Sequence, residues 1–134
     1  MDIHINVLAL LVAAAANYLF ATLWYALLFA KAWKRLTGIT EMKPAPLNML
    51  LSFIGSLVIS FVLYHSIVFG DAFFKIGGIH GGLMGGFFGW LGYVAPVTLT
   101  TKLYEKKPWG LWFLDNGFWL LSLLMMGMIL SAWM

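Results

Sequence analysis

Asp115 is a carboxylate inside the last long apolar stretch of this sequence, and there it could handle a proton or a cation. A charge in hydrocarbon costs a few kcal/mol unless it is paired or neutralised, so a buried acid at this place would suggest function. Asn116 and Gly117 follow directly, however, and this run also fits a helix N-cap at the membrane surface. We favour the cap slightly over the buried acid.

Further polar and aromatic side chains fall within the apolar stretches. Asn17 lies near the middle of the first one, where an amide usually bonds a neighbouring helix but could also line a small cavity. Trp24 and Trp119 could stack against a ligand. If the bundle encloses a pore or cavity, we expect its lining to include Asn17, Trp24, Ser52, Ser56, Ser60, Asp115, Trp119 and Ser122.

Metal binding has weaker support. His4, His65 and His80 could hold zinc, copper or a haem together with nearby carboxylates, but their spacing matches no motif. Methionines cluster near the end of the chain, where Cu(I) transport could use them, although filling apolar gaps is their commoner role. The chain has no cysteine, which excludes thiolate ligands and disulfides. We expect no bound cofactor.

Several function classes lack support in this sequence. It contains no nucleophile with an adjacent base and orienting group, no phosphate-binding loop between strand and helix, and no pair of catalytic carboxylates. The net charge of +3 arises from cations at the ends of apolar stretches rather than on one soluble face. We therefore expect a protein that is not an enzyme and does not bind nucleic acid.

Four apolar runs must position these groups. With 63% hydrophobic and only 10% charged residues, and a mean hydropathy of +0.92, the chain lies far outside the range of soluble domains. A helix needs about 20 residues to cross a hydrocarbon core. We predict an all-α membrane protein, a single four-helix transmembrane bundle over residues 1–134, with spans at about 3–29, 47–69, 79–103 and 111–133.

The distribution of Lys and Arg predicts the orientation. Seven of these residues lie in the first and third connections, and only Lys75 lies in the second. The positive-inside rule then places both termini outside the cytoplasm, which we expect for a multi-pass protein of a bacterial inner membrane. Aromatic residues near the span ends, including Tyr25 and Trp33, are typical of interfacial belts. The expected partner on all sides is the lipid bilayer.

The third span has one smooth face and one bulky face. Small residues let helix backbones approach closely in lipid. The second span carries Ser52, Ser56 and Ser60 on one side, and we predict that this side packs against the smooth face, or that part of the smooth face joins the subunits of a homo-oligomer. The smooth face consists of Gly78, Gly81, Gly82, Gly85, Gly86, Gly89 and Gly92.

One further pattern of residues runs along most of the chain. It consists of Leu23-Trp24-Tyr25, Leu28-Phe29, Lys31, Trp33, Gly92, Pro96, Glu105, Trp109, Asn116, Gly117, Trp119 and Gly127. In these residues the sequence resembles a bacterial membrane family catalogued as domain of unknown function 1761. The resemblance implies a compact four-helix inner-membrane protein and carries no established activity. The sequence departs from the family pattern at Ala26-Leu27, where a small residue and a proline are usual, and at Ala30, where glycine is usual.

These patterns favour a small channel or transporter for a solute or ion, working as a homo-oligomer. An accessory or assembly subunit of a larger membrane complex is an alternative, because short connections and extensive apolar helix surface would suffice for it. A metal- or haem-binding membrane protein is a further alternative.

Overall fold

The computed structural model describes residues 6–38 and 46–133, and these residues form helices and short connections without a β-strand. Two of the helical segments, η1 and η2, are π-helical. The elements are α1 (Val7–Thr22), η1 (Leu23–Leu28), α2 (Ala30–Thr37), α3 (Pro46–Phe74), α4 (Gly78–Gly89), η2 (Trp90–Val94), α5 (Ala95–Tyr104) and α6 (Trp109–Ala132).

Four helical segments are long and apolar enough to cross a membrane, which confirms the predicted all-α fold with four spans. The protein is therefore a multi-pass membrane protein. His4 and Lys43 lie outside the described residues. The spans run over Val7–Leu28, Pro46–Phe74, Gly78–Tyr104 and Trp109–Ala132.

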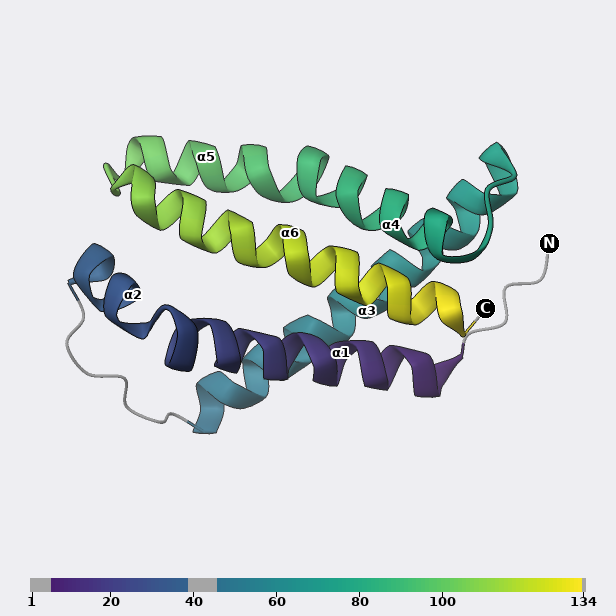
Figure 1. The fold of residues 1–134 in the computed structure, drawn as a ribbon, viewed down its shortest axis with the longest axis horizontal. Coiled ribbons are helices and arrows are strands. Elements are labelled where there is room, and N and C mark those ends of the chain that lie inside the picture. The colour runs from purple at the N-terminus through teal and green to yellow at the C-terminus, as the bar shows by residue number, and fades with distance from the viewer. Residues whose placement is uncertain (1–5, 39–45, 134) are drawn as a thin grey trace.

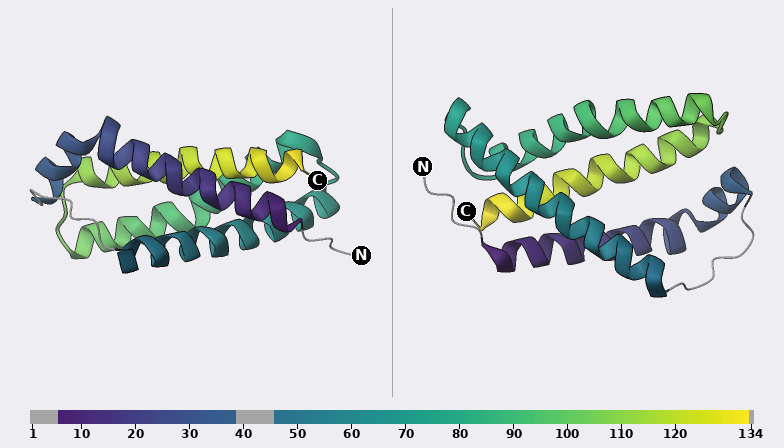
Figure 2. Two further views of the ribbon diagram at one scale, coloured as in Figure 1. Left: turned by 90° about the horizontal axis from the view of Figure 1, so that it is seen from below. Right: turned by 180° about the vertical axis from the view of Figure 1, so that it is seen from behind.

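The arrangement divides the bundle into two halves. Helix α6 runs between α1 on one side and the continuous α4–η2–α5 segment on the other, while α3 crosses them obliquely (Figures 1 and 2). The start of α1, the end of α6 and the α3–α4 connection lie at one end, and α2 and the α5–α6 connection lie at the other (Figure 1). We call these the terminal half and the basic half, because the second holds Lys31, Lys34, Arg35, Lys102, Lys106 and Lys107.

Glycines bring α4 into direct backbone contact with α6 in the terminal half. A Cβ atom added at Gly82 would overlap the carbonyl oxygen of Gly127, and one added at Gly127 would overlap the carbonyl oxygen of Gly82. A Cβ at Gly86 would lie 2.5 Å from the carbonyl oxygen of Leu123. Because ordinary Cβ atoms do not fit at such separations, only glycine allows the two helices to lie this close.

The other glycines of the smooth face lie against α3 or have open space beside them. Gly81 and Gly85 lie against Asp71 and Ile67 of α3, whereas a Cβ added at Gly78, Gly89 or Gly92 would meet nothing within 4 Å. The predicted serine partner for this face is wrong. Ser56 and Ser60 of α3 instead face α1, where the Nδ2 of Asn17 donates to Ser56 (2.7 Å) and Ser60 donates to the carbonyl of Leu10 (3.0 Å).

The connection that follows the first span contains a helix that the sequence analysis did not predict. The chain leaves helical geometry at Phe29, with φ −121° and ψ 24°, directly after the π-helical segment η1. Helix α2 then begins at Ala30, and Leu36 packs against Gly110 at the start of α6. The bend therefore forms without a proline, and π-helical geometry accompanies it.

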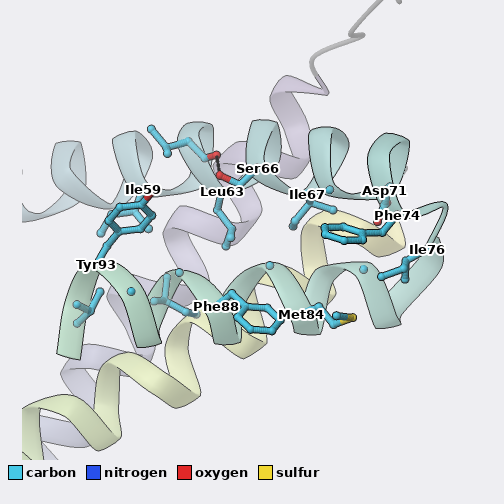
Figure 3. A pocket seen from close by; sticks show the side chains of 18 of the residues that line it. Ile59, Leu63, Ser66, Ile67, Asp71, Phe74, Ile76, Met84, Phe88 and Tyr93 are labelled. Carbon is cyan, nitrogen blue, oxygen red and sulfur yellow. Dashed lines mark hydrogen bonds between the residues drawn. The ribbon is translucent and has the colours of Figure 1, made fainter. Parts of the chain in front are cut away.

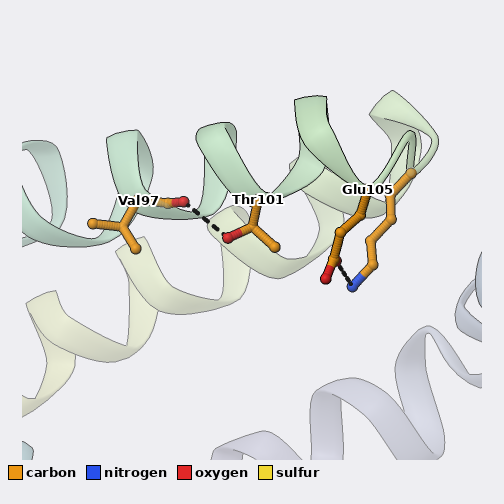
Figure 4. Close-up of polar contacts among 4 residues, drawn as sticks. Val97, Thr101 and Glu105 are labelled. Carbon is orange, nitrogen blue, oxygen red and sulfur yellow. Dashed lines mark hydrogen bonds and ion pairs between the residues drawn. The ribbon is translucent and has the colours of Figure 1, made fainter.

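A polar connection joins α5 to α6 in the basic half (Figure 4). The hydroxyl of Thr101 donates to the carbonyl of Val97 (3.2 Å), and Lys107 pairs with Glu105 (2.9 Å). The hydrogen bond and charge of Glu105 raise the pKa of Lys107 above its usual value, so this lysine is cationic at neutral pH. Helix α6 begins two residues later, at Trp109.

Candidate functional site

A groove of about 950 Å³ lies between α3 and α4 (Figure 3). Apolar side chains such as Ile59, Leu63, Met84 and Phe88 surround it (Figure 3). The hydroxyl of Ser66, in this lining, donates to the carbonyl of Val62 of the same helix (2.9 Å). We call it the α3–α4 groove.

The α3–α4 groove offers little for orienting a polar solute. Asp71 stands at its end in the terminal half, beside Phe74 and Ile76, and the remaining lining is apolar apart from Ser66 and the Tyr93 hydroxyl (Figure 3). Binding sites for solutes usually combine an apolar wall with several convergent polar groups. The groove therefore fits hydrocarbon better than a hydrophilic molecule.

An open pocket of about 450 Å³ brings together polar and aromatic side chains from four elements in the basic half. Tyr25 comes from η1, Trp33 from α2, Thr98 from α5, and Asp115 and Trp119 from α6. We call this cavity the Asp115 pocket.

Asp115 is a half-buried residue inside α6, so the favoured prediction of an N-cap is wrong. Pro108 occupies the cap position and α6 begins at Trp109. At about 1.5 Å per residue, Asp115 lies about 9 Å along the helix from that residue. The Tyr25 hydroxyl donates a hydrogen bond of 2.6 Å to its Oδ1. No Lys or Arg in the described ranges forms an ion pair with it.

Aromatic packing holds Tyr25 and Trp119 in place around this carboxylate. The buried ring of Phe118 lies edge-on to both of them, with ring centroids 5.3 Å from Tyr25 and 5.0 Å from Trp119. Because Phe118 and Asp115 lie three residues apart on α6, they share one side of the helix. The ring of Phe118 therefore supports Tyr25 from the same helical face that carries its hydrogen-bond acceptor.

The Thr98 wall of the pocket is fixed by a buried amide on α6. The Thr98 hydroxyl lies 3.0 Å from the Oδ1 of Asn116 and 2.8 Å from the carbonyl of Val94, and it donates its one proton to either acceptor. The indole of Trp90 donates to the Asn116 carbonyl (3.0 Å). The Nδ2 of Asn116 donates to the carbonyl of Trp112 (2.9 Å). These bonds tie η2 and α5 to α6 directly beside Asp115.

A second polar cluster lies in the middle of the bundle, and its groups are bonded to one another. Asn17 donates to Ser56, Ser122 donates to the Oδ1 of Asn17, and Ser56 lies 3.1 Å from the carbonyl of Ser52. Asn17, Ser56 and Ser122 are almost completely buried. We call these three residues the Asn17 network. None of them lines the Asp115 pocket or the α3–α4 groove.

The remaining predicted lining residues also lie away from both cavities. Ser60 is bonded to the backbone of α1, and Ser52 is exposed on α3. Trp24 packs among the rings of Phe20, Phe29 and Phe118, and its indole nitrogen is buried without a hydrogen-bond partner in the part of the chain that is described. Of the eight predicted lining residues, Asp115 and Trp119 share a cavity.

The histidines do not gather in the described structure. His65 lies among the rings of Phe61, Tyr64 and Phe69, with its Nδ1 2.8 Å from the Phe61 carbonyl. His80 is exposed on α4. Residues 6–38 and 46–133 contain no group of three or more His, Cys, Asp or Glu side chains able to hold a metal ion.

Sequence reasoning missed three of the five pocket residues. Tyr25 and Trp33 were interpreted as interfacial aromatic residues, and Thr98 was not singled out. Tyr25, near the end of the first span, and Trp33, in α2, do belong to the stretch that carries the family resemblance, and that stretch was the available signal. The connection between Thr98 and Asn116 had no counterpart in the sequence pattern, because it depends on how α5 and α6 lie together.

Comparison with known proteins supports the resemblance. The family model described as "Protein of unknown function (DUF1761)" matches residues 8–131. Comparisons with curated proteins and with solved structures gave no match.

Proposed function

The chain belongs to the family described as protein of unknown function (DUF1761), and on the geometry above we propose that it is a non-enzymatic transport protein that binds a small solute in the Asp115 pocket. The observation that carries this proposal is the Tyr25–Asp115 hydrogen bond at the wall of a cavity within the membrane-length helices. Ionisable groups at such places usually mark a solute or ion pathway, because burying them costs free energy that packing does not return.

The composition of the pocket supports solute binding. Three aromatic side chains form an apolar wall, and two hydroxyls and a carboxylate line the same space. Its volume of about 450 Å³ falls within the range of small-molecule sites, about 300–1,000 Å³. The polar groups of the Asn17 network, in contrast, are bonded to one another, so they do not support a solute path in the middle of the bundle.

The proposal includes an orientation. Under the positive-inside rule the basic half faces the cytoplasm, and both termini lie outside it in a bacterial inner membrane. The Asp115 pocket would then load from the cytoplasmic side. Transport would require a second conformation in which the contacts of the terminal half open.

A labelling experiment tests the orientation. Because the chain has no cysteine, single cysteines at Lys75→Cys and Lys106→Cys give matched probes in the two connections. We expect a membrane-impermeant maleimide to label Lys75→Cys in intact cells, and to label Lys106→Cys only after permeabilisation. The reverse pattern would overturn the orientation.

An uptake experiment tests transport. Proteoliposomes would be given labelled tetraethylammonium, mannitol or glutarate, which are a cation, a neutral solute and an anion. We expect uptake of at least one above that of protein-free vesicles, reduced about tenfold or more by Asp115→Asn. Ser66→Ala in the α3–α4 groove is the matched control and should transport normally. If none of the three exceeds protein-free vesicles, or if Asp115→Asn transports like the wild type, the proposal is wrong.

A further inference from the structure

We propose that the ligand of the Asp115 pocket is a small organic cation, specifically an alkylammonium carrying N–H groups. This inference rests on the proposed function, since it names the chemical class of the solute for that same pocket. It follows from a carboxylate, two oxygen acceptors and three aromatic rings that line one cavity.

The charge of the pocket favours a cation. Asp115 is its acidic residue, and no Lys, Arg or His stands among its lining residues. Lys107 is the basic side chain with an electrostatic influence on Asp115, but its Nζ is paired with Glu105 at 2.9 Å. Lys31 and Lys34 are exposed on α2. An anion entering the cavity would meet a carboxylate without a compensating charge in its walls.

The hydrogen bonds of the pocket favour a donor. The Tyr25 hydroxyl has a single proton and gives it to Asp115, and the Thr98 hydroxyl gives its proton to Asn116 or to a carbonyl of its own helix. The oxygen atoms of Tyr25, Thr98 and Asp115 can therefore only accept further bonds when Asp115 is ionised. A ligand that satisfies them must bring N–H or O–H donors, and an ammonium group brings up to three.

The aromatic lining favours an organic cation over a metal ion. The faces of Trp and Tyr rings attract alkylated ammonium groups, and such contacts contribute about 0.5–2 kcal/mol each. A divalent metal would instead require six or more oxygen ligands or a comparable donor set. Trp33 and Trp119 cannot supply such ligands, and the described chain holds no group of three metal-binding side chains.

Calorimetric titration of the purified full-length protein in detergent tests this assignment with four probes that share one ring. Benzylammonium is the cation with N–H groups, benzyltrimethylammonium is the cation without them, benzyl alcohol is neutral, and benzoate is the anion. We expect benzylammonium to bind most tightly, and benzyltrimethylammonium to bind about three- to tenfold more weakly. Benzyl alcohol and benzoate should show no saturable binding.

Substitutions test whether benzylammonium binds in the Asp115 pocket. Asp115→Asn keeps the shape of the side chain and should weaken benzylammonium binding about 10- to 100-fold, because a hydrogen bond to a charged group is lost. Ser66→Ala should bind like the wild type. Thermal unfolding of each variant shows that it is folded. Trp33→Ala changes a different side chain of the same pocket and should also weaken benzylammonium binding.

The outcomes separate this inference from the proposed function. Benzoate or benzyl alcohol binding in an Asp115-dependent manner, without benzylammonium, would overturn the cation assignment and leave solute transport in place. Equal benzylammonium affinity in the wild type and Asp115→Asn would also overturn the assignment. If none of the four probes binds and none of the three uptake probes is transported, both proposals are wrong.

Discussion

The terminal half and the basic half of the bundle place polar groups among the same apolar helices, yet they use them differently. In the terminal half and the middle of the bundle, the Asn17 network bonds to itself and glycines bring α4 onto α6. In the basic half, Asp115 has a single hydrogen-bond partner beside a cavity, and α2, η1 and η2 contain no buried residue.

This difference shows how two polar residues within membrane-length helices acquire different roles. An amide whose partners are other buried side chains joins helices. A carboxylate that keeps acceptor capacity next to a cavity requires a partner from outside the chain, or a proton. The distinction follows from the chemistry of the two groups and from their bonding partners. Four predictions test it, in order of decreasing effect.

The glycine contact of the terminal half should be the most sensitive to a small change. Gly82→Ala places a methyl group on the Gly127 carbonyl and should reduce the free energy of unfolding by about 1–3 kcal/mol. The matched variant Gly89→Ala has open space around its methyl group and should be unchanged or up to about 1 kcal/mol more stable. Unfolding in SDS, followed by circular dichroism, measures both. Equal effects would contradict the helix contact.

The Asn17 network should make the second-largest contribution to stability. Asn17→Ala removes bonds to both Ser56 and Ser122 and should reduce the free energy of unfolding by about 1–2 kcal/mol, while solute binding stays intact. Ser66→Ala removes a hydroxyl bonded within its own helix and should change stability by less than about 0.5 kcal/mol. If Asn17→Ala abolished binding without destabilising the protein, the structural role of this amide would be wrong.

Substitution of Thr98, in the basic half, should have a smaller effect on stability. Thr98→Val keeps the side-chain shape but leaves the buried Oδ1 of Asn116 without its donor, which should cost about 1 kcal/mol of unfolding free energy. Thr100→Val, whose hydroxyl bonds its own helix at the surface, is the control and should have no measurable effect. Comparable losses in both variants would argue that Thr98 does not hold α5 to α6.

Tyr25 should have the smallest effect on stability and a clear effect on binding. Tyr25→Phe removes the hydroxyl bonded to Asp115, so we expect benzylammonium affinity to fall about three- to tenfold and the unfolding free energy to change by less than about 1 kcal/mol. Calorimetry and SDS unfolding of the same preparation measure the two. Unchanged affinity would show that the hydroxyl does not position the carboxylate for a ligand.

The sequence was sufficient for the fold class but not for all helix neighbours. Hydropathy located the four spans, since their length and composition depend only on local sequence. The side of α3 that carries Ser56 and Ser60 was correctly seen as small and polar, but small residues do not identify their partner. Asn17 supplied a better partner than the glycines of α4, because it satisfies the serine hydroxyl as well as packing against it.

The candidate site was predictable only in part. Asp115 and Trp119 were identified, but the start of α6 at Trp109 depends on Pro108 rather than on the Asp-Asn-Gly run, so the cap prediction failed. Tyr25 was missed because an aromatic residue near the end of a span fits an interfacial belt. The sequence does not show that η1 and α6 bring its hydroxyl to Asp115.

At the reciprocal contact between Gly82 and Gly127, a larger residue at one position cannot be compensated by a smaller residue at the other. Where two side chains of unequal size meet, enlarging one can be offset by shrinking the other, but here both positions already carry the smallest side chain. Any substitution at one site must therefore be absorbed by moving a whole helix. We therefore expect the double substitution to destabilise the protein at least as much as the more destabilising of the two single substitutions.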